Sequence, residues 1–394
     1  MNFLETRELV ISTLSPVHIG CGEDYEPTNY VIEEGFLYAF DPALLLARLD
    51  QPLRDELSRA LDDRQPLLAA QRFFYRHKTL AIEIASHRAP VVPEVAKLYA
   101  SRVGQAANRE QSGKTVINKL EIARTAFNPH ASLPIIPGTS LKGAMRTALL
   151  EALRTEAGKR YPGGKAGEME KDLLGGSFET DPLRLVKVAD AMFQPGSYKA
   201  RNPAGEEIQR QREPRTMLFQ ANRKKRPNQF EARGKIATLL ECIPAGQPYA
   251  LAGQLTIERK AGLGEKTPQR QIGMDLIVRA CNDFYLPRLD AELSLLEGNH
   301  YISASWAKNA RSRLAPTGIW GKAIAEGRGF MLRVGRHSGA ESVTLDAPRQ
   351  IKIMKGQGQP AETASAATTV WLAAHEPGAT QDMLPFGWVY VQAK

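Results

Sequence analysis

The chain contains 394 residues, which is more than a single hydrophobic core usually organises, so we expect two domains. Its 43% hydrophobic and 24% charged residues are typical of a globular protein and exclude a disordered chain. The 52 basic and 43 acidic residues leave a formal net charge of +9, which favours a polyanionic partner.

No apolar run approaches the roughly 18 to 20 residues that cross a bilayer, and the first residues lack a signal-peptide pattern, so we expect a cytoplasmic protein. The cysteines are odd in number and far apart, which argues against a disulfide framework and a structural zinc site. We therefore expect neither a metal nor another cofactor. Burial in the core is expected for the cysteines and for most tryptophans: Cys21, Cys242, Cys281, Trp306, Trp320, Trp371 and Trp388.

The chain begins with predicted strands. Residues 8–14 form a β-type run, and residues 30–32 and 36–40 are typical of a hairpin that turns at a Glu-Glu-Gly sequence. Asp41 and Pro42 then predict the start of a helix, because Asp caps a helix well and Pro fits its first position. We expect residues 41–128 to be mainly helical.

A glycine-rich loop follows the apolar segment 133–136 and leads into an Ala- and Leu-rich helix. Its glycines allow backbone amides to approach an anion, and its hydroxyl and basic side chains could bind phosphate oxygens. The candidate residues are Gly138, Thr139, Ser140, Lys142 and Arg146. The spacing does not match a nucleoside triphosphate loop, and an ordinary capped helix start explains these residues equally well.

Most of the excess positive charge lies in residues 199–235, which contain eleven basic and four acidic residues. Tyr198, Phe219 and Phe230 lie among these cations, a combination that suits phosphate contacts together with base stacking. The densest part is Arg223, Lys224, Lys225 and Arg226. We favour a nucleic-acid-binding arm over the alternative, a solvated loop.

The last third contains a predicted strand at 248–258, a helix within 272–296 and a final strand at 384–391, with a second domain starting near residue 268. The Gly-rich run 327–339 is a further strand candidate. Alternation along it could place Arg333 and Arg336 near one face, toward an RNA backbone. A simple exposed hairpin is the alternative.

His18 lies in a Gly-rich turn after the first strand. A lone histidine is more often a hydrogen-bonded structural residue or a stacking partner than a catalyst. The rival interpretation is a metal-independent endoribonuclease in which His18 and Asp24 activate a ribose 2′-hydroxyl group and a lysine stabilises the transition state. No second histidine nearby supports that chemistry.

Four segments resemble those of the RAMP superfamily of CRISPR proteins, and they occur in the expected order. They are SPVHIGCG (15–22), IPGTSLKGAMR (136–146), FMLRVGRHSG (330–339) and LPFGWV (384–389). Within that superfamily, the chain resembles the type III-A (Csm complex) subunit that caps the 3′ side of the guide RNA.

This resemblance implies an α+β fold with two ferredoxin-like (RRM-like) domains. Residues 1–267 would form the first, with a helical insertion at about 41–130 and a basic arm at about 195–236, and residues 268–394 would form the second. It also implies a non-catalytic subunit that binds the 3′ region of the crRNA and contributes to crRNA maturation and antiviral defence. Its partners would be crRNA, neighbouring RAMP subunits and, indirectly, target RNA. Within the family pattern, His18, Gly138, Lys142 and Arg146 would contact RNA.

Overall fold

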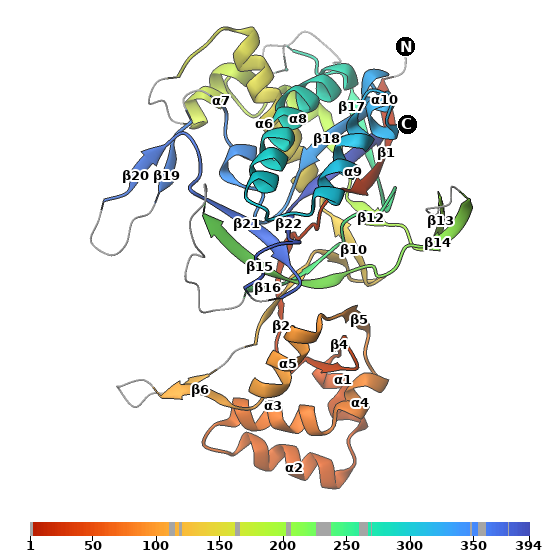
Figure 1. Cartoon of the computed structure of the whole chain (residues 1–394), viewed down its shortest axis with the longest axis vertical. Helices are drawn as coiled ribbons and strands as arrows, with labels where there is room; N and C mark the ends of the chain where they lie inside the picture. Colours follow the sequence, from red (N-terminus) through yellow and green to blue (C-terminus); the bar gives the residue numbers. More distant parts are fainter. Residues whose placement is uncertain are drawn as a thin grey trace.

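The structure is a computed structural model that describes residues 3–109, 115–117, 120–161, 166–201, 206–225, 238–259, 267–268, 270–346, 349–353, 360–376 and 378–394. It is a mixed α+β protein (Figure 1). None of the helices in these ranges is both long and apolar enough to cross a bilayer.

The larger sheet contains strands from both ends of the chain. Its members are β1 (Leu4–Thr13), β9 (Phe127–Asn128), β10 (Leu133–Ile136), β11 (Val186–Val188), β12 (Ala191–Phe193), β17 (Leu251–Glu258), β18 (Gly329–Arg333) and β23 (Trp388–Ala393). They follow the order β18-β23-β1-β17-β12-β10-β9, with β11 also paired to β17, and all the pairs are antiparallel. The second half of β1, residues 9–13, is buried because it lies between β17 and β23.

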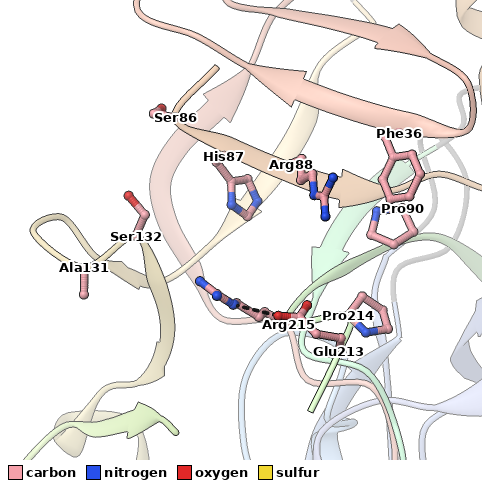
Figure 2. Close-up of a pocket in the computed structure, with 10 residues that line it drawn as sticks. All are labelled: Phe36, Ser86, His87, Arg88, Pro90, Ala131, Ser132, Glu213, Pro214 and Arg215. Atoms are coloured by element: carbon pink, nitrogen blue, oxygen red, sulfur yellow. Dashed lines mark hydrogen bonds and ion pairs between the residues drawn. The ribbon is translucent and has the colours of Figure 1, made fainter. Parts of the chain in front are cut away.

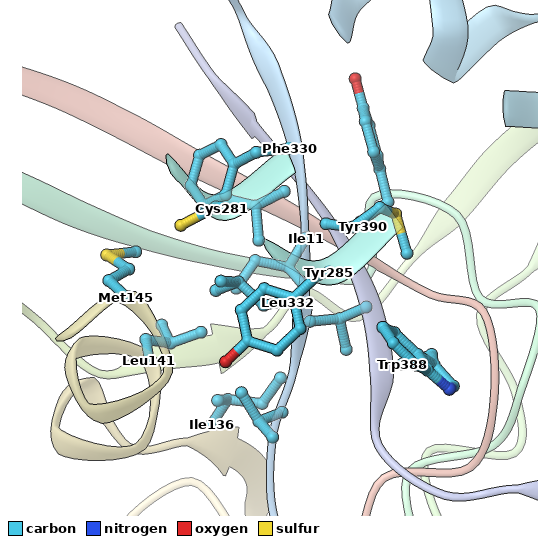
Figure 3. Packing of buried hydrophobic residues seen from close by; sticks show 14 of the residues in the cluster. Ile11, Ile136, Leu141, Met145, Cys281, Tyr285, Phe330, Leu332, Trp388 and Tyr390 are labelled. Atoms are coloured by element: carbon cyan, nitrogen blue, oxygen red, sulfur yellow. The ribbon is translucent and has the colours of Figure 1, made fainter. Parts of the chain in front are cut away.

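Two long helices, α6 (Gly138–Glu156) and α8 (Met274–Gly298), pack against each other and against this sheet (Figure 1). Tyr285 of α8 lies edge-on to Trp388 of β23 with the ring centroids 6.2 Å apart, and its hydroxyl group donates to the carbonyl of Ala144 in α6 at 3.1 Å. Figure 3 shows these rings beside Leu332 and Ile11. The predicted strand at the start of the chain, the helix after the Gly loop and the helix within 272–296 are confirmed.

A second sheet contains β2 (Gly20–Tyr25), β8 (Ile122–Thr125), β15 (Met217–Lys225), β16 (Thr238–Cys242), β21 (Thr369–Ala374) and β22 (Leu384–Pro385). Its order is β2-β8-β16-β15-β21-β22, and only β8 and β16 run parallel among these neighbours. Both sheets combine strands from the two sides of residue 267, where we expect a domain boundary.

The insertion between β2 and β8 forms the lower part of Figure 1. It contains β3 (Tyr30–Glu33), β4 (Phe36–Ala39), α1 (Pro42–Arg48), α2 (Gln51–Leu61), α3 (Pro66–Arg76), α4 (Lys78–Glu83), β5 (His87–Pro90), α5 (Pro93–Arg102), β6 (Ala106–Arg109) and β7 (Thr115–Ile117). The β3–β4 hairpin and the Asp41 cap, which accepts from the Ala43 amide at 2.8 Å, are confirmed. The expectation of helix up to residue 128 is wrong, because β5 interrupts the helices, α5 ends at Arg102 where Val103 turns extended (ψ 128°), and strands follow.

The remaining elements lie around these sheets and helices. They are α7 (Ala166–Leu174), η1 (Pro182–Leu185), β13 (Ser197–Arg201), β14 (Glu207–Gln211), α9 (Ala304–Leu314), α10 (Ile319–Ala325), η2 (Ala340–Ser342), β19 (Ile351–Ile353) and β20 (Glu362–Ala364). The expected basic arm is thus divided, because β13 and β14 form a separate hairpin while β15 is part of the second sheet. Among the cysteines, Cys242 and Cys281 are buried as expected, but the expectation for Cys21 is wrong, since it lies exposed on β2.

Candidate nucleic-acid interface

Three Gly-rich segments that are far apart in the sequence meet at the ends of β1, β18 and β23. The amide of Arg336 donates to the carbonyl of His18 at 2.8 Å, and the amide of Gly387 donates to the carbonyl of Pro16 at 2.8 Å. Gly335 has φ +82°, and a Cβ atom there would lie 2.2 Å from the His18 carbonyl oxygen. Glycine is required at this position because the two backbones lie too close together for a side chain.

His18 is fully buried beneath this junction. Its Nδ1 atom donates to the backbone carbonyl of Glu241 at 2.7 Å, since a carbonyl can only accept. Burial lowers the pKa of His18, so the neutral imidazole is favoured. The ring has no exposed surface that a ribose or a base could approach in this arrangement, and it fits the structural interpretation of a lone histidine.

The Gly loop at the start of α6 packs against β11 and the turn that follows it. The Gly138 amide donates to Asp190 Oδ1 at 2.7 Å, and a Cβ atom at Gly138 would lie 2.1 Å from the Val188 carbonyl oxygen. Thr139 is exposed and Ser140 is half-buried. Glycine is therefore required here by a contact within the protein, and the Gly138 amide is already occupied.

The two cations of this loop also have partners within the protein. Lys142 Nζ donates to the Val186 carbonyl at 2.8 Å. Arg146 forms ion pairs with Asp181 at 2.8 Å and with Glu170 at 2.9 Å. A phosphate group would have to compete with these carboxylates for Arg146.

Arg333 and Arg336 do not share a face, so that expectation is wrong. Strand β18 ends at Arg333, whose buried guanidinium pairs with Glu292 at 2.9 Å and donates to the Phe386 carbonyl at 3.0 Å. The chain then turns at Gly335 and leaves Arg336 exposed. Only Arg336 of the two is available to a partner molecule.

The basic part of β15 alternates between the two faces of its sheet. Arg223 is exposed, whereas Lys224 is buried. Nothing is described for the side chain of Lys225, and Arg226 lies outside the described residues. The alternation follows from strand geometry, in which successive side chains point to opposite faces.

Arg223 belongs to a stacked group that we call the Trp371 surface, defined as Arg223, Arg336, His337 and Trp371. Arg223 and Trp371 are cross-strand partners on β15 and β21, with the guanidinium carbon 5.9 Å from the indole centroid. The Trp371 and His337 rings stack with their centroids 4.5 Å apart and an interplanar angle of 24°. Both arginines are exposed, and both rings are half-buried. Guanidinium groups beside stacked rings can bind an RNA backbone and its bases together.

Sequence patterns singled out Arg223 and Arg336 but did not connect them with His337 or Trp371. Trp371 is expected in the core, yet it is half-buried, unlike the fully buried Trp388. Arg223 and Trp371 come together through the register of β15 with β21, a pairing between segments separated by about 150 residues. Among the described residues, no group of three or more His, Cys, Asp or Glu side chains could hold a metal ion.

Burial, with smaller contributions from the charges of Arg336 and His18, lowers the pKa of His337 to about 4. The unfolded chain binds this proton near the ordinary pKa of 6.5, so the free energy of unfolding should fall as the pH drops from 6.5 toward 4. His337→Asn should remove up to about 2 kcal/mol of the loss between pH 7 and pH 5. Urea unfolding of both proteins at the two pH values measures this, and an equal loss in both would contradict it.

The model of the RAMP superfamily matches residues 10–308. The chain belongs to the RAMP superfamily. This confirms the family resemblance, and the matched residues include the Gly-rich segments around His18 and Gly138.

Two curated relatives show how this RAMP chain compares with known proteins in sequence. It is 25% identical to the CRISPR system Cms protein Csm5 of Methanocaldococcus jannaschii over 210 residues, which cover 49% of this chain and 44% of that protein. It is 27% identical to Csm5 of Mycobacterium tuberculosis H37Rv over 194 residues, or 46% of this chain and 48% of that protein. The chain thus spans about half the length of the curated relatives it matches.

The fold is also similar to two solved structures. One is a chain of a cryo-EM structure of a Csm-crRNA-target RNA ternary complex of a type III-A CRISPR-Cas system, with a TM-score of 0.53, 16% identity and coverage of 98% of this chain and 100% of that chain. The other is the crystal structure of T. onnurineus Csm5, with a TM-score of 0.50, 15% identity and coverage of 97% and 99%. The mixed α+β fold is shared with both.

Proposed function

We propose that this chain is a Csm5-like, non-catalytic RNA-binding subunit of a type III-A CRISPR effector complex that caps the 3′ region of the crRNA. The observation that carries the proposal is the Trp371 surface, where exposed arginines from distant segments lie beside two stacked, half-buried rings. Neighbouring RAMP subunits and, indirectly, target RNA are the further partners, and crRNA maturation in antiviral defence is the process served.

Two finer points belong to the same proposal. The chain would contain two ferredoxin-like domains divided near residue 267, joined through the sheets that they share. The Gly loop would provide a second RNA contact through the exposed Thr139 and the half-buried Ser140. Lys142 and Arg146 would join that contact only by exchanging their present partners for phosphate.

The test is a double variant, Arg223→Gln with Arg336→Gln. If both guanidiniums contact phosphates, affinity for single-stranded RNA at about 0.15 M salt should fall about tenfold or more, and the slope of log K against log salt should become shallower by about 1 to 1.5. Fluorescence anisotropy with labelled RNA at several salt concentrations measures both quantities.

The matched control is Arg48→Gln with Arg59→Gln, which removes two exposed arginines from α1 and α2 of the insertion. Its affinity and slope should equal those of the unmodified chain. Equal slopes in all three proteins would contradict the proposed surface. The same samples run on a denaturing gel, with and without chelator, test the alternative of a metal-independent endoribonuclease, which requires a discrete cleavage product.

A further inference from the structure

A second candidate site, lined by residues other than those of the Trp371 surface, lies where the insertion meets the second sheet. A cavity of about 770 Å³ opens between β4 and β5 of the insertion, the turn before β10 and the loop before β15 (Figure 2). The side chains that bear on its chemistry are Phe36, His87, Arg88, Ser132, Glu213 and Arg215. Its volume lies within the range of about 300 to 1,000 Å³ that small-molecule sites occupy.

The innermost group beside this cavity is a buried carboxylate. Glu241 Oε1 accepts from His87 Nε2 at 2.7 Å and from Thr216 Oγ1 at 2.8 Å. Glu241 Oε2 accepts from the Tyr25 hydroxyl at 3.1 Å and from the Thr125 amide at 3.2 Å. Burial opposes ionisation, but these hydrogen bonds and the charge of His87 outweigh it, so the pKa of Glu241 is lowered.

This carboxylate fixes the orientation of His87. Because Nε2 donates to Glu241, the remaining ring nitrogen, Nδ1, belongs to a side chain that lines the cavity and is 11% exposed. The ring of Tyr25 lies parallel to the imidazole at an interplanar angle of 4°. A histidine held by a buried carboxylate on one nitrogen can present the other to a ligand.

Two guanidinium groups give the cavity a positive character. Arg215 pairs with Glu213 through Nε at 3.1 Å, a bond that does not use its terminal nitrogens. Arg88 is exposed and lies 5.5 Å from the centroid of the Phe36 ring. The only exposed carboxylate among the described lining residues is Glu213, whereas two arginines line the same space. This combination suits a ligand with an anionic end and a flat, apolar end.

We propose that this cavity binds a single phosphorylated ribonucleoside, with its phosphate toward Arg215 and His87 and its base against Phe36 and Arg88. Phe36 and the nearby Arg88 guanidinium offer a stacking platform for the base. The ligand is either a free nucleotide or one nucleotide of a bound RNA strand, since both present the same chemistry. The site does not depend on the proposed capping of the crRNA.

Calorimetric titration of the full chain with AMP, adenosine and inorganic phosphate tests this site. We expect AMP to bind more tightly than either fragment. Arg215→Gln should weaken AMP binding about tenfold or more and leave adenosine binding nearly unchanged, whereas Phe36→Ala should weaken both. Arg59→Gln, on the exposed face of α2, is the matched control and should bind AMP as the unmodified chain does.

Competition with a short single-stranded RNA separates the two sources of ligand. Displacement of AMP by RNA would support a nucleotide of a strand, and retention of AMP would support a free nucleotide. The Arg223→Gln, Arg336→Gln variant should keep its AMP affinity, so failure of the proposed RNA surface leaves this result intact. The proposal is overturned if AMP does not bind to the unmodified chain. It is also overturned if the Arg215→Gln and Phe36→Ala proteins, with unchanged melting temperatures, bind AMP as tightly as the unmodified chain does.

Discussion

Replacing Arg333 with methionine should lower the free energy of unfolding by about 3 to 5 kcal/mol, because it leaves a buried carboxylate without its counter-ion. Arg333 and Glu292 each expose only 5% of their side chains, and their ion pair joins β18 to α8. The other oxygen of Glu292 accepts from Trp388 Nε1 at 2.6 Å, which connects β23 to the same group. Urea unfolding at neutral pH measures the loss.

The double variant Arg333→Met with Glu292→Leu is the informative control. It removes both charges, so it should recover much of the stability that Arg333→Met loses, even though the Trp388 indole then lacks its acceptor. If Arg333→Met left stability unchanged and weakened RNA binding instead, Arg333 would be an RNA-contacting residue after all. The experiment therefore separates the structural role seen here from the role expected from sequence.

The second large effect is expected for Glu241→Ala, which should also cost about 3 to 5 kcal/mol of the free energy of unfolding. Four donors, from His87, Thr216, Tyr25 and Thr125, would lose their acceptor at once. These donors come from the insertion, from β2 and β8 of the second sheet and from the loop before β15, so the variant should loosen the junction between them. Urea unfolding measures the change.

The pH dependence gives an independent check on Glu241. Its pKa is lower in the folded protein than the ordinary value of 4.5, so its contribution is fully present above that value and is lost as the pH falls below it. Glu241→Gln should therefore show a smaller loss of stability on acidification than the unmodified chain. The control Glu83→Ala, at the end of α4, should lie within about 0.5 kcal/mol of the unmodified chain because Glu83 is exposed. A similar cost for both variants would contradict the network.

Local sequence patterns predicted much of the secondary structure. The Asp41-Pro42 helix start, the hairpin at residues 30–39 and the helix after Gly138 all have short-range causes, namely capping, turn chemistry and hydrophobic spacing. The end of the helical part was missed, because α5 ends at Arg102 within a sequence whose hydrophobic spacing does not mark that position.

The candidate site was predicted less well, since its chemistry depends on which distant groups meet. Lys142 and Arg146 carry the charges of an anion site, but a carbonyl and two carboxylates from residues 170–186 occupy them. His87 lies in no recognisable motif. It becomes a candidate ligand-binding residue only because Glu241, 154 positions later, accepts its hydrogen bond. No local pattern contains such a partner.

The sequence by itself determined the superfamily and the excess of positive charge, because both reside in short segments or in composition. Only the tertiary structure decided which cations are available. It buried Arg333 against Glu292, paired Arg146 with acids, and left Arg223 and Arg336 exposed beside stacked rings. The physical reason is that a charge is neutralised or left free according to its neighbours in space, and folding brings those neighbours from other helices, strands and turns of the chain.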